Sequence, residues 1–112
     1  MSDQLAKYLG LCRRAGKAAC GTEAVRTAAR QGKAKLVLLA GDASDNTDKR
    51  INNLCAYYQV PLARLSQSCI RLGEMVGMGG TAALAICDDS FAGCVTACLE
   101  QPGEIPADSE QR

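Results

Sequence analysis

The chain has 112 residues, of which 47% are hydrophobic and 22% charged, and its formal net charge is +1. This length and composition indicate one globular domain rather than a disordered or fibrous chain. The sequence holds no histidine, which excludes Ser-His-Asp and Cys-His catalytic groups and imidazole-ligated metal sites. Its four aromatic residues argue against an aromatic platform for stacking RNA bases.

Apolar residues at helical spacing alternate along the chain with short, continuous apolar runs. Leu5, Leu9 and Cys12 share one face of a helix that Gly16 ends, and residues 36–40 are typical of a central strand covered on both faces. The predicted elements are, in chain order, a helix over 3–15, an extended segment at 17–20, a helix over 22–31, a strand at 36–40, a helix over 46–58, an edge strand at 60–65, a helix over 66–76, a strand at 82–87 and a helix over 90–100.

This alternation predicts an α/β fold, namely a three-layer α/β/α sandwich around a small mixed sheet of about four strands. We expect residues 1–100 to form the single domain and residues 101–112 to form a polar, frayed tail. Polar residues at the helix starts are the predicted N-caps: Thr22, then Ser66 or Ser68, then Asp88-Asp89. Within the helix over 66–76, the residues expected to face the core are Ile70, Met75 and Val76.

The seven cysteines are interpreted as reduced packing thiols in a cytoplasmic protein. Their number is odd, no basic-then-apolar signal pattern precedes them, and no apolar run is long enough to span a membrane. The alternative is a metal or redox site, for which Cys94 and Cys98 have i,i+4 spacing. No Cys-x-x-Cys pair supports that alternative, so neither a metal nor a cofactor is expected.

The net charge of +1 conceals a marked asymmetry along the chain. Residues 1–35 hold eight basic and two acidic residues, whereas residues 36–112 hold five basic and ten acidic residues. The first segment therefore carries +6 and the second −5. This asymmetry is typical of a face that binds a polyanion, although a solvated basic surface would give the same pattern.

Two glycine motifs differ in their relation to the predicted elements. Residues 77–80 (Gly-Met-Gly-Gly) follow a helix and lead into a strand, which is the reverse of a nucleotide-binding loop. Gly21-Thr22 begins a helix, where free amides and the helix dipole favour a phosphate, close in sequence to Lys17 and Arg26. An ordinary capped helix start is the alternative for this second motif.

Several segments together resemble the kink-turn RNA-binding ribosomal protein family, the L7Ae and L30e group, in its bacterial YlxQ-like branch. These segments are LGLCRRAGK at 9–17, Gly21, GKAKLVLLA at 32–40, DAS at 42–44, Val60-Pro61, Leu72-Gly73 and the glycines at 77–80. The resemblance implies an α/β/α sandwich that binds structured RNA, ribosomal or kink-turn-like, without catalysis or a small-molecule substrate. The alternative is a protein-interaction adaptor on the same fold.

In the family, the start of the second helix and the loop before the last strand hold the RNA. The resemblance, together with the basic residues around that helix, therefore gives the candidate RNA-binding residues Lys17, Gly21, Thr22, Glu23, Arg26, Thr27, Arg30, Lys33, Met78, Gly79 and Gly80. The family motif Gly-x-Asn-Glu-x-x-Lys matches this chain at Gly21 only. Glu23, Ala24 and Thr27 replace its asparagine, glutamate and lysine, so recognition of a standard kink-turn is in question.

Overall fold

The computed structural model describes residues 2–99, and the tail predicted at 101–112 lies outside these residues. The elements are, in chain order, α1 (Ser2–Arg14), β1 (Ala18–Cys20), α2 (Thr22–Arg30), β2 (Leu36–Leu39), α3 (Asp45–Tyr58), β3 (Leu62–Arg64), α4 (Cys69–Met75), β4 (Ala83–Ile86) and α5 (Asp89–Leu99). All nine predicted elements are present among the described residues, with ends that differ by a few residues.

The four strands form one mixed sheet in the order β1-β4-β2-β3. β4 runs antiparallel to both β1 and β2, whereas β3 runs parallel to β2. Every residue of β2 and β4 is buried, as their continuous apolar runs predict for central strands, and β3 lies at an edge.

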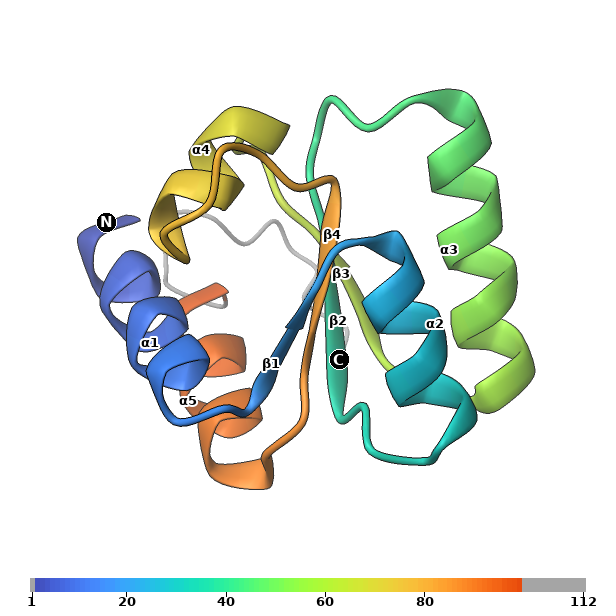
Figure 1. The fold of residues 1–112 in the computed structure, drawn as a ribbon, viewed down its shortest axis with the longest axis horizontal. Helices are drawn as coiled ribbons and strands as arrows, with labels where there is room; N and C mark the ends of the chain where they lie inside the picture. The colour runs from blue at the N-terminus through green and yellow to red at the C-terminus, as the bar shows by residue number, and fades with distance from the viewer. Residues whose placement is uncertain (1, 100–112) are drawn as a thin grey trace.

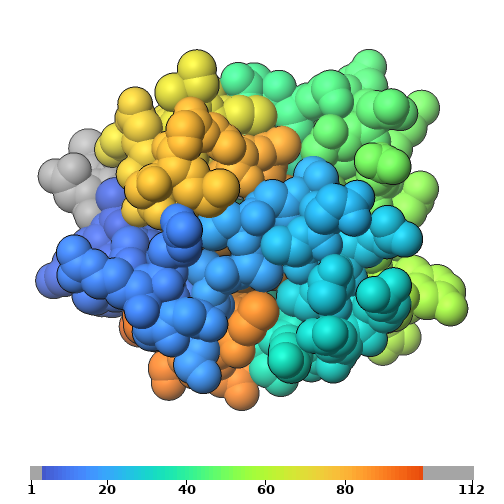
Figure 2. Space-filling view, viewed as in Figure 1, coloured from blue at the N-terminus to red at the C-terminus, as the bar shows by residue number. Residues whose placement is uncertain are grey.

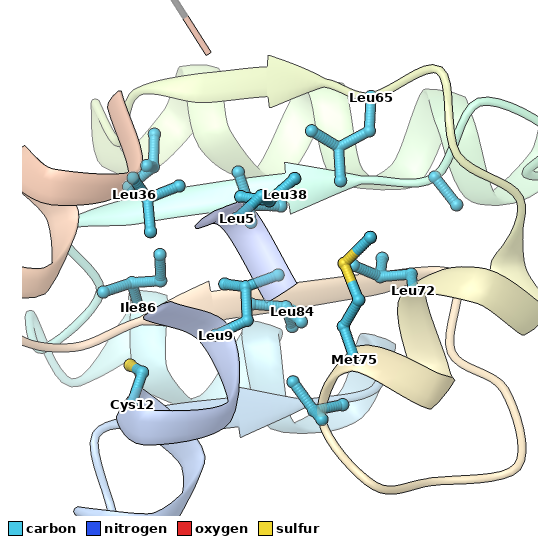
Figure 3. Packing of buried hydrophobic residues seen from close by; sticks show 13 residues of the cluster. Leu5, Leu9, Cys12, Leu36, Leu38, Leu65, Leu72, Met75, Leu84 and Ile86 are labelled. Carbon is cyan, nitrogen blue, oxygen red and sulfur yellow. The ribbon is translucent and has the colours of Figure 1, made fainter. Parts of the chain in front are cut away.

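Helices cover both faces of the sheet, which confirms the predicted three-layer sandwich (Figure 1). α1, α4 and α5 pack on one face, where Leu9, Leu84 and Ile86 belong to one buried cluster (Figure 3). α2 and α3 pack on the other face around Val25 and Ala85. Residues 84 and 85 thus point to opposite faces, as adjacent strand residues must.

The helix starts bear out some predicted caps and correct others. Ser68 caps α4 by accepting a hydrogen bond from the Arg71 amide, and Asp88 accepts one from the Phe91 amide at the start of α5. The prediction for Thr22 is wrong, because Gly21 occupies the N-cap position and Thr22 is the first helical residue.

The prediction that Ile70 faces the core is also wrong, because its side chain is 63% exposed. Met75 and Val76 are buried as expected, together with Leu72. α4 begins only at Cys69, so Ile70 lies in its first turn, about 160° around the helix from the buried Leu72.

Candidate nucleic-acid interface

The start of α2 and the loop before β4, both predicted for the site, lie at the same end of the strands. We call this end of the sheet the upper edge, from its place in Figure 1, and the opposite strand ends the lower edge. At this edge β1, β2 and β3 end and β4 begins. The Gly21 amide donates to the Ala83 carbonyl at 2.9 Å, and the Ala40 amide donates to the Ala82 carbonyl at 2.8 Å. These bonds hold the start of α2 and the residue after β2 beside the beginning of β4. The start of α2 and the segment that leads into β4 lie on the face shown in Figure 2.

The start of α2 has an unusual backbone and no side-chain cap. Gly21 has φ 102° and ψ 153°, a conformation that residues with a Cβ rarely adopt. Side chains cap α3, α4 and α5, but none caps α2. The amides of its first turn therefore remain available to oxygen atoms of a ligand, and the helix dipole favours an anionic one.

The glycine loop, residues 77–81, has a shape fixed by contacts at both ends. The Met78 amide donates to the Gly73 carbonyl at 2.7 Å, and the Met78 side chain packs against the core. At the other end, the buried Thr81 donates from its amide to the Cys69 carbonyl at 3.0 Å. The Thr81 hydroxyl also donates to a β4 carbonyl at 2.9 Å. The exposed part of the loop is therefore mainly backbone, at residues 77, 79 and 80.

Arg13, near the end of α1, is a contributor to this edge that the sequence did not indicate. Its Nη1 donates to the Val76 carbonyl at 2.6 Å, directly before the glycine loop. The two residues are 63 positions apart, so no local pattern could reveal the contact. The hydrogen bond ties α1 to the loop that the family resemblance assigns to RNA.

Lys17 and Lys33, both predicted for the site, lie at the opposite or lower edge of the sheet. Lys17 directly precedes β1, and its carbonyl accepts a hydrogen bond from the Cys87 amide at 2.7 Å. Burial raises the pKa of the Cys87 thiol, whereas Lys33, Lys17 and Lys35 act in the opposite direction. These three residues form the lysine cluster. The nine residues of α2, about 13 Å of helix, separate this cluster from Gly21.

The exposed side chains of α2 connect the two edges. Glu23, Arg26, Thr27 and Arg30 are exposed along the helix. Glu23 and Arg26 form an ion pair of 3.5 Å whose side chains are 78% and 58% exposed, so solvent screens it and it holds neither group firmly. Both groups can therefore exchange this contact for one with a ligand.

The two sides of α2 border different grooves. Thr27 and Ala24 line a shallow groove of about 360 Å³ beside β1 that also contacts Lys33 and Cys87. Arg26 and Thr22 line a groove of about 570 Å³ between α2 and α3. The predicted site residues on α2 therefore do not all face one surface, although the helix brings them within one turn or two of each other.

All seven cysteines are free thiols, as expected. Cys12 and Cys55 are buried in the two cores, and burial raises the pKa of Cys12 to about 11. Cys94 is exposed and is the exception to the interpretation of packing thiols.

Over residues 2–99, no three Cys, Asp or Glu side chains gather in a way that could hold a metal ion. No helix in the same range combines the length and apolar character needed to cross a membrane.

Comparisons with known proteins agree with this fold and with the resemblance. The chain is 37% identical over 92 residues to the RNA-binding protein YlxQ of Bacillus subtilis (strain 168), covering 82% of this chain and 91% of that protein. It is also 37% identical over 84 residues to the RNA-binding protein YlxQ of Enterococcus faecium, covering 75% of this chain and 80% of that protein.

A solved structure of a protein of unknown function from Bacillus halodurans has a TM-score of 0.79 to this chain at 28% identity. The match covers 86% of this chain and 96% of that chain. Residues 3–96 match the model of the ribosomal protein L7Ae/L30e/S12e/Gadd45 family. The chain is therefore a member of the ribosomal protein L7Ae/L30e/S12e/Gadd45 family.

Proposed function

We propose that this chain is a non-catalytic RNA-binding protein that holds structured RNA at the upper edge of its sheet. The observation that carries the proposal is the uncapped start of α2, fixed beside the glycine loop by the hydrogen bond from Gly21 to Ala83. Membership of the family and the names of the two YlxQ relatives support RNA as the ligand.

Affinity would come mainly from contacts to the phosphate backbone. Arg26 and Arg30 are exposed on α2, and neither forms a strong ion pair with a described residue. They follow the first helical turn along α2, so an RNA strand that starts at the amides of this turn can continue along the helix. The lysine cluster at the lower edge would contact the same RNA strand only if the RNA extends over the whole helix. Contacts of this kind fix orientation without reading sequence.

Base reading would be weaker than in relatives that carry the full family motif. Ala24 offers only a methyl group where the motif has a glutamate, so it cannot accept a hydrogen bond from a guanine edge. Glu23 places a carboxylate where the motif has a neutral amide, and this carboxylate already pairs with Arg26. Each lost bidentate base contact lowers discrimination by about 1–3 kcal/mol, by analogy with base reading in DNA. We therefore propose structured ribosomal RNA as the target, with reduced preference for a standard kink-turn.

The test is a filter-binding series with total ribosomal RNA and a kink-turn hairpin at several salt concentrations. We expect dissociation constants in the micromolar range or below that rise steeply with salt. Arg26→Ala and Arg30→Ala should each weaken binding, whereas the matched control Lys49→Ala, an exposed lysine of α3 without an ion pair to a described residue, should not. Lack of binding to both RNAs would refute the proposal, and equal losses in all three variants would indicate diffuse electrostatics.

A gain-of-function variant tests the proposed weak base reading. The triple substitution Glu23→Asn, Ala24→Glu and Thr27→Lys restores the motif without touching the glycine loop. We expect the ratio of affinities for the kink-turn hairpin over a hairpin of equal length to rise at least about tenfold, which corresponds to about 1.4 kcal/mol. An unchanged ratio would show that these three positions do not read the RNA in this chain.

The proposal includes a cytoplasmic location, which rests on the seven free cysteines, because thiols stay reduced in that compartment. The protein-interaction adaptor is not favoured, since both YlxQ relatives are named as RNA-binding proteins. Protein partners that remain bound to the chain after nuclease treatment would support the adaptor instead.

A further inference from the structure

The groove between α2 and α3 shares Thr22, Glu23 and Arg26 with the site inferred from the family, but its α3 side lies outside that site. It measures about 570 Å³ and, on its α3 side, follows one helical stripe of residues 50, 53, 54 and 57. This spacing of i, i+3, i+4 and i+7 places the four side chains on one face of α3, beside the buried face that carries Ile51 and Cys55. Leu54 is half-buried, whereas Arg50, Asn53 and Tyr57 are exposed.

The groove has an apolar floor with an aromatic ring at its rim. Ile51 is 2% exposed and forms part of the floor beside Leu54. Tyr57 is 78% exposed, and its ring packs edge-to-face against Tyr58, with centroids 4.8 Å apart and planes at 86°. Because Tyr58 packs against the core, it supports the Tyr57 ring in one orientation and leaves most of that ring accessible. Such a ring can stack on the face of any RNA base.

Two guanidinium groups flank the same groove from opposite helices. Arg26 contributes from α2 and Arg50 from α3. Only Arg26 has a partner in the described part of the chain, the exposed Glu23 at 3.5 Å. A ligand with a flat apolar part and a negatively charged part therefore complements the groove, with the flat part on the Tyr57 ring and the charge between the two arginines.

We propose that the groove binds an unpaired nucleotide segment of the RNA whose folded part lies at the upper edge. This inference rests on the proposed function, because Thr22 and Glu23 at the start of α2 also line the groove. A strand that leaves the folded RNA at that helix start enters the groove without crossing an intervening element. One base stacks on Tyr57, and the adjacent phosphate lies between Arg26 and Arg50.

The test compares one structured ribosomal RNA hairpin with the same hairpin carrying six unpaired uridines at its 5′ or 3′ end. For the wild-type chain, we expect one of the extended RNAs to bind at least about five times more tightly than the blunt hairpin. Tyr57→Ala and Arg50→Ala should abolish this gain without changing the affinity for the blunt hairpin. Tyr57→Phe, which keeps the stacking ring, and the neighbouring control Lys49→Ala should retain it.

The outcomes separate this inference from the proposed function. Equal binding of blunt and extended hairpins would overturn the groove and leave the function intact. A gain that Tyr57→Ala and Arg50→Ala do not reduce would also overturn it, because the unpaired segment would then bind elsewhere. If no RNA binds at all, the proposed function fails and the inference fails with it. A protein that stays bound after nuclease treatment and is lost on Tyr57→Ala would assign the groove to a protein partner and overturn the RNA assignment.

Discussion

Substitution of Gly73 by alanine should destabilise the protein, although alanine is normally more favourable than glycine within a helix. Gly73 is buried in α4, and a Cβ at this position would lie 2.5 Å from the amide nitrogen and 2.9 Å from the carbonyl carbon of Gly80. Because the obstacle is backbone, the glycine loop or the helix must move. Overpacking of this kind lowers the free energy of unfolding by about 1–3 kcal/mol, whereas the higher helix propensity of alanine raises it by about 1 kcal/mol. We expect a net loss of up to about 2 kcal/mol.

Gly93 provides the matched control within the same fold. It lies in α5 and is exposed, and a Cβ added there would have no neighbour within 4 Å outside its own helical backbone, so Gly93→Ala should raise the free energy of unfolding by about 0.5–1 kcal/mol. Urea denaturation followed by circular dichroism at 222 nm measures both variants. Stabilisation by Gly73→Ala would refute the close packing of α4 against the loop. Weaker RNA binding by Gly73→Ala, with unchanged binding by Gly93→Ala, is the expected functional counterpart.

Three further predictions concern single contacts. Arg13→Ala removes the hydrogen bond to the Val76 carbonyl and should lower the free energy of unfolding by about 1 kcal/mol in urea; an unchanged value would contradict a role for this contact. The folded-state pKa of Cys12 is about 11 against an ordinary 9.0, so the unfolded chain ionises first and stability should fall between pH 9 and 11, by an amount on the order of 2 kcal/mol. Alkaline denaturation of Cys12→Ala should show a smaller decline, and an equal decline would refute this cause. Hydrogen bonds from the Cys69 thiol and amide hold the pKa of Asp42 below its usual 3.8, so their stabilisation is present above that pH and is lost as the pH falls through the lower folded-state value. Acid titration of Asp42→Asn should lack this component, and an acid midpoint and slope identical to those of the wild type would refute it.

The buried strands were the most predictable part of the fold. Residues 36–39 and 83–86 are continuous apolar runs, and only a strand covered on both faces buries every residue of such a run. The errors occurred at helix starts. A threonine after a glycine is an ordinary cap in sequence, but Gly21 takes a positive φ and the cap position itself. The helix cap is therefore one residue earlier than predicted, and because glycine has no side chain, α2 has no side-chain cap. The free amides that result matter more for function than the one-residue difference in the helix boundary.

The candidate site was predictable only in part, because proximity in sequence does not give direction in space. Gly21 and the glycine loop meet at one edge, as the family resemblance implied. Lys17 precedes Gly21 by 4 residues and Lys33 follows it by 12, so both lie close to it in sequence. However, β1 approaches the upper edge and α2 leaves it, so the strand begins and the helix ends at the lower edge. The two lysines therefore lie near each other and far from the glycine.

Because the lysine cluster lies at the lower edge, the salt dependence of binding can show how far along α2 the RNA extends. The net charge of +1 gives little long-range attraction, so the salt dependence of binding reports local phosphate contacts rather than overall charge. By analogy with duplex DNA, each contact contributes roughly −0.9 to the slope of log K against log salt concentration. Contacts to Arg26 and Arg30 alone give a slope of about −1.8, whereas an RNA that also contacts all three residues of the lysine cluster gives about −4.5. A wild-type slope near the larger value that Lys33→Ala reduces by about one contact would place the RNA along the whole of α2. A slope near the smaller value that Lys33→Ala leaves unchanged would confine the RNA to the upper edge, with the lysine cluster outside the interface.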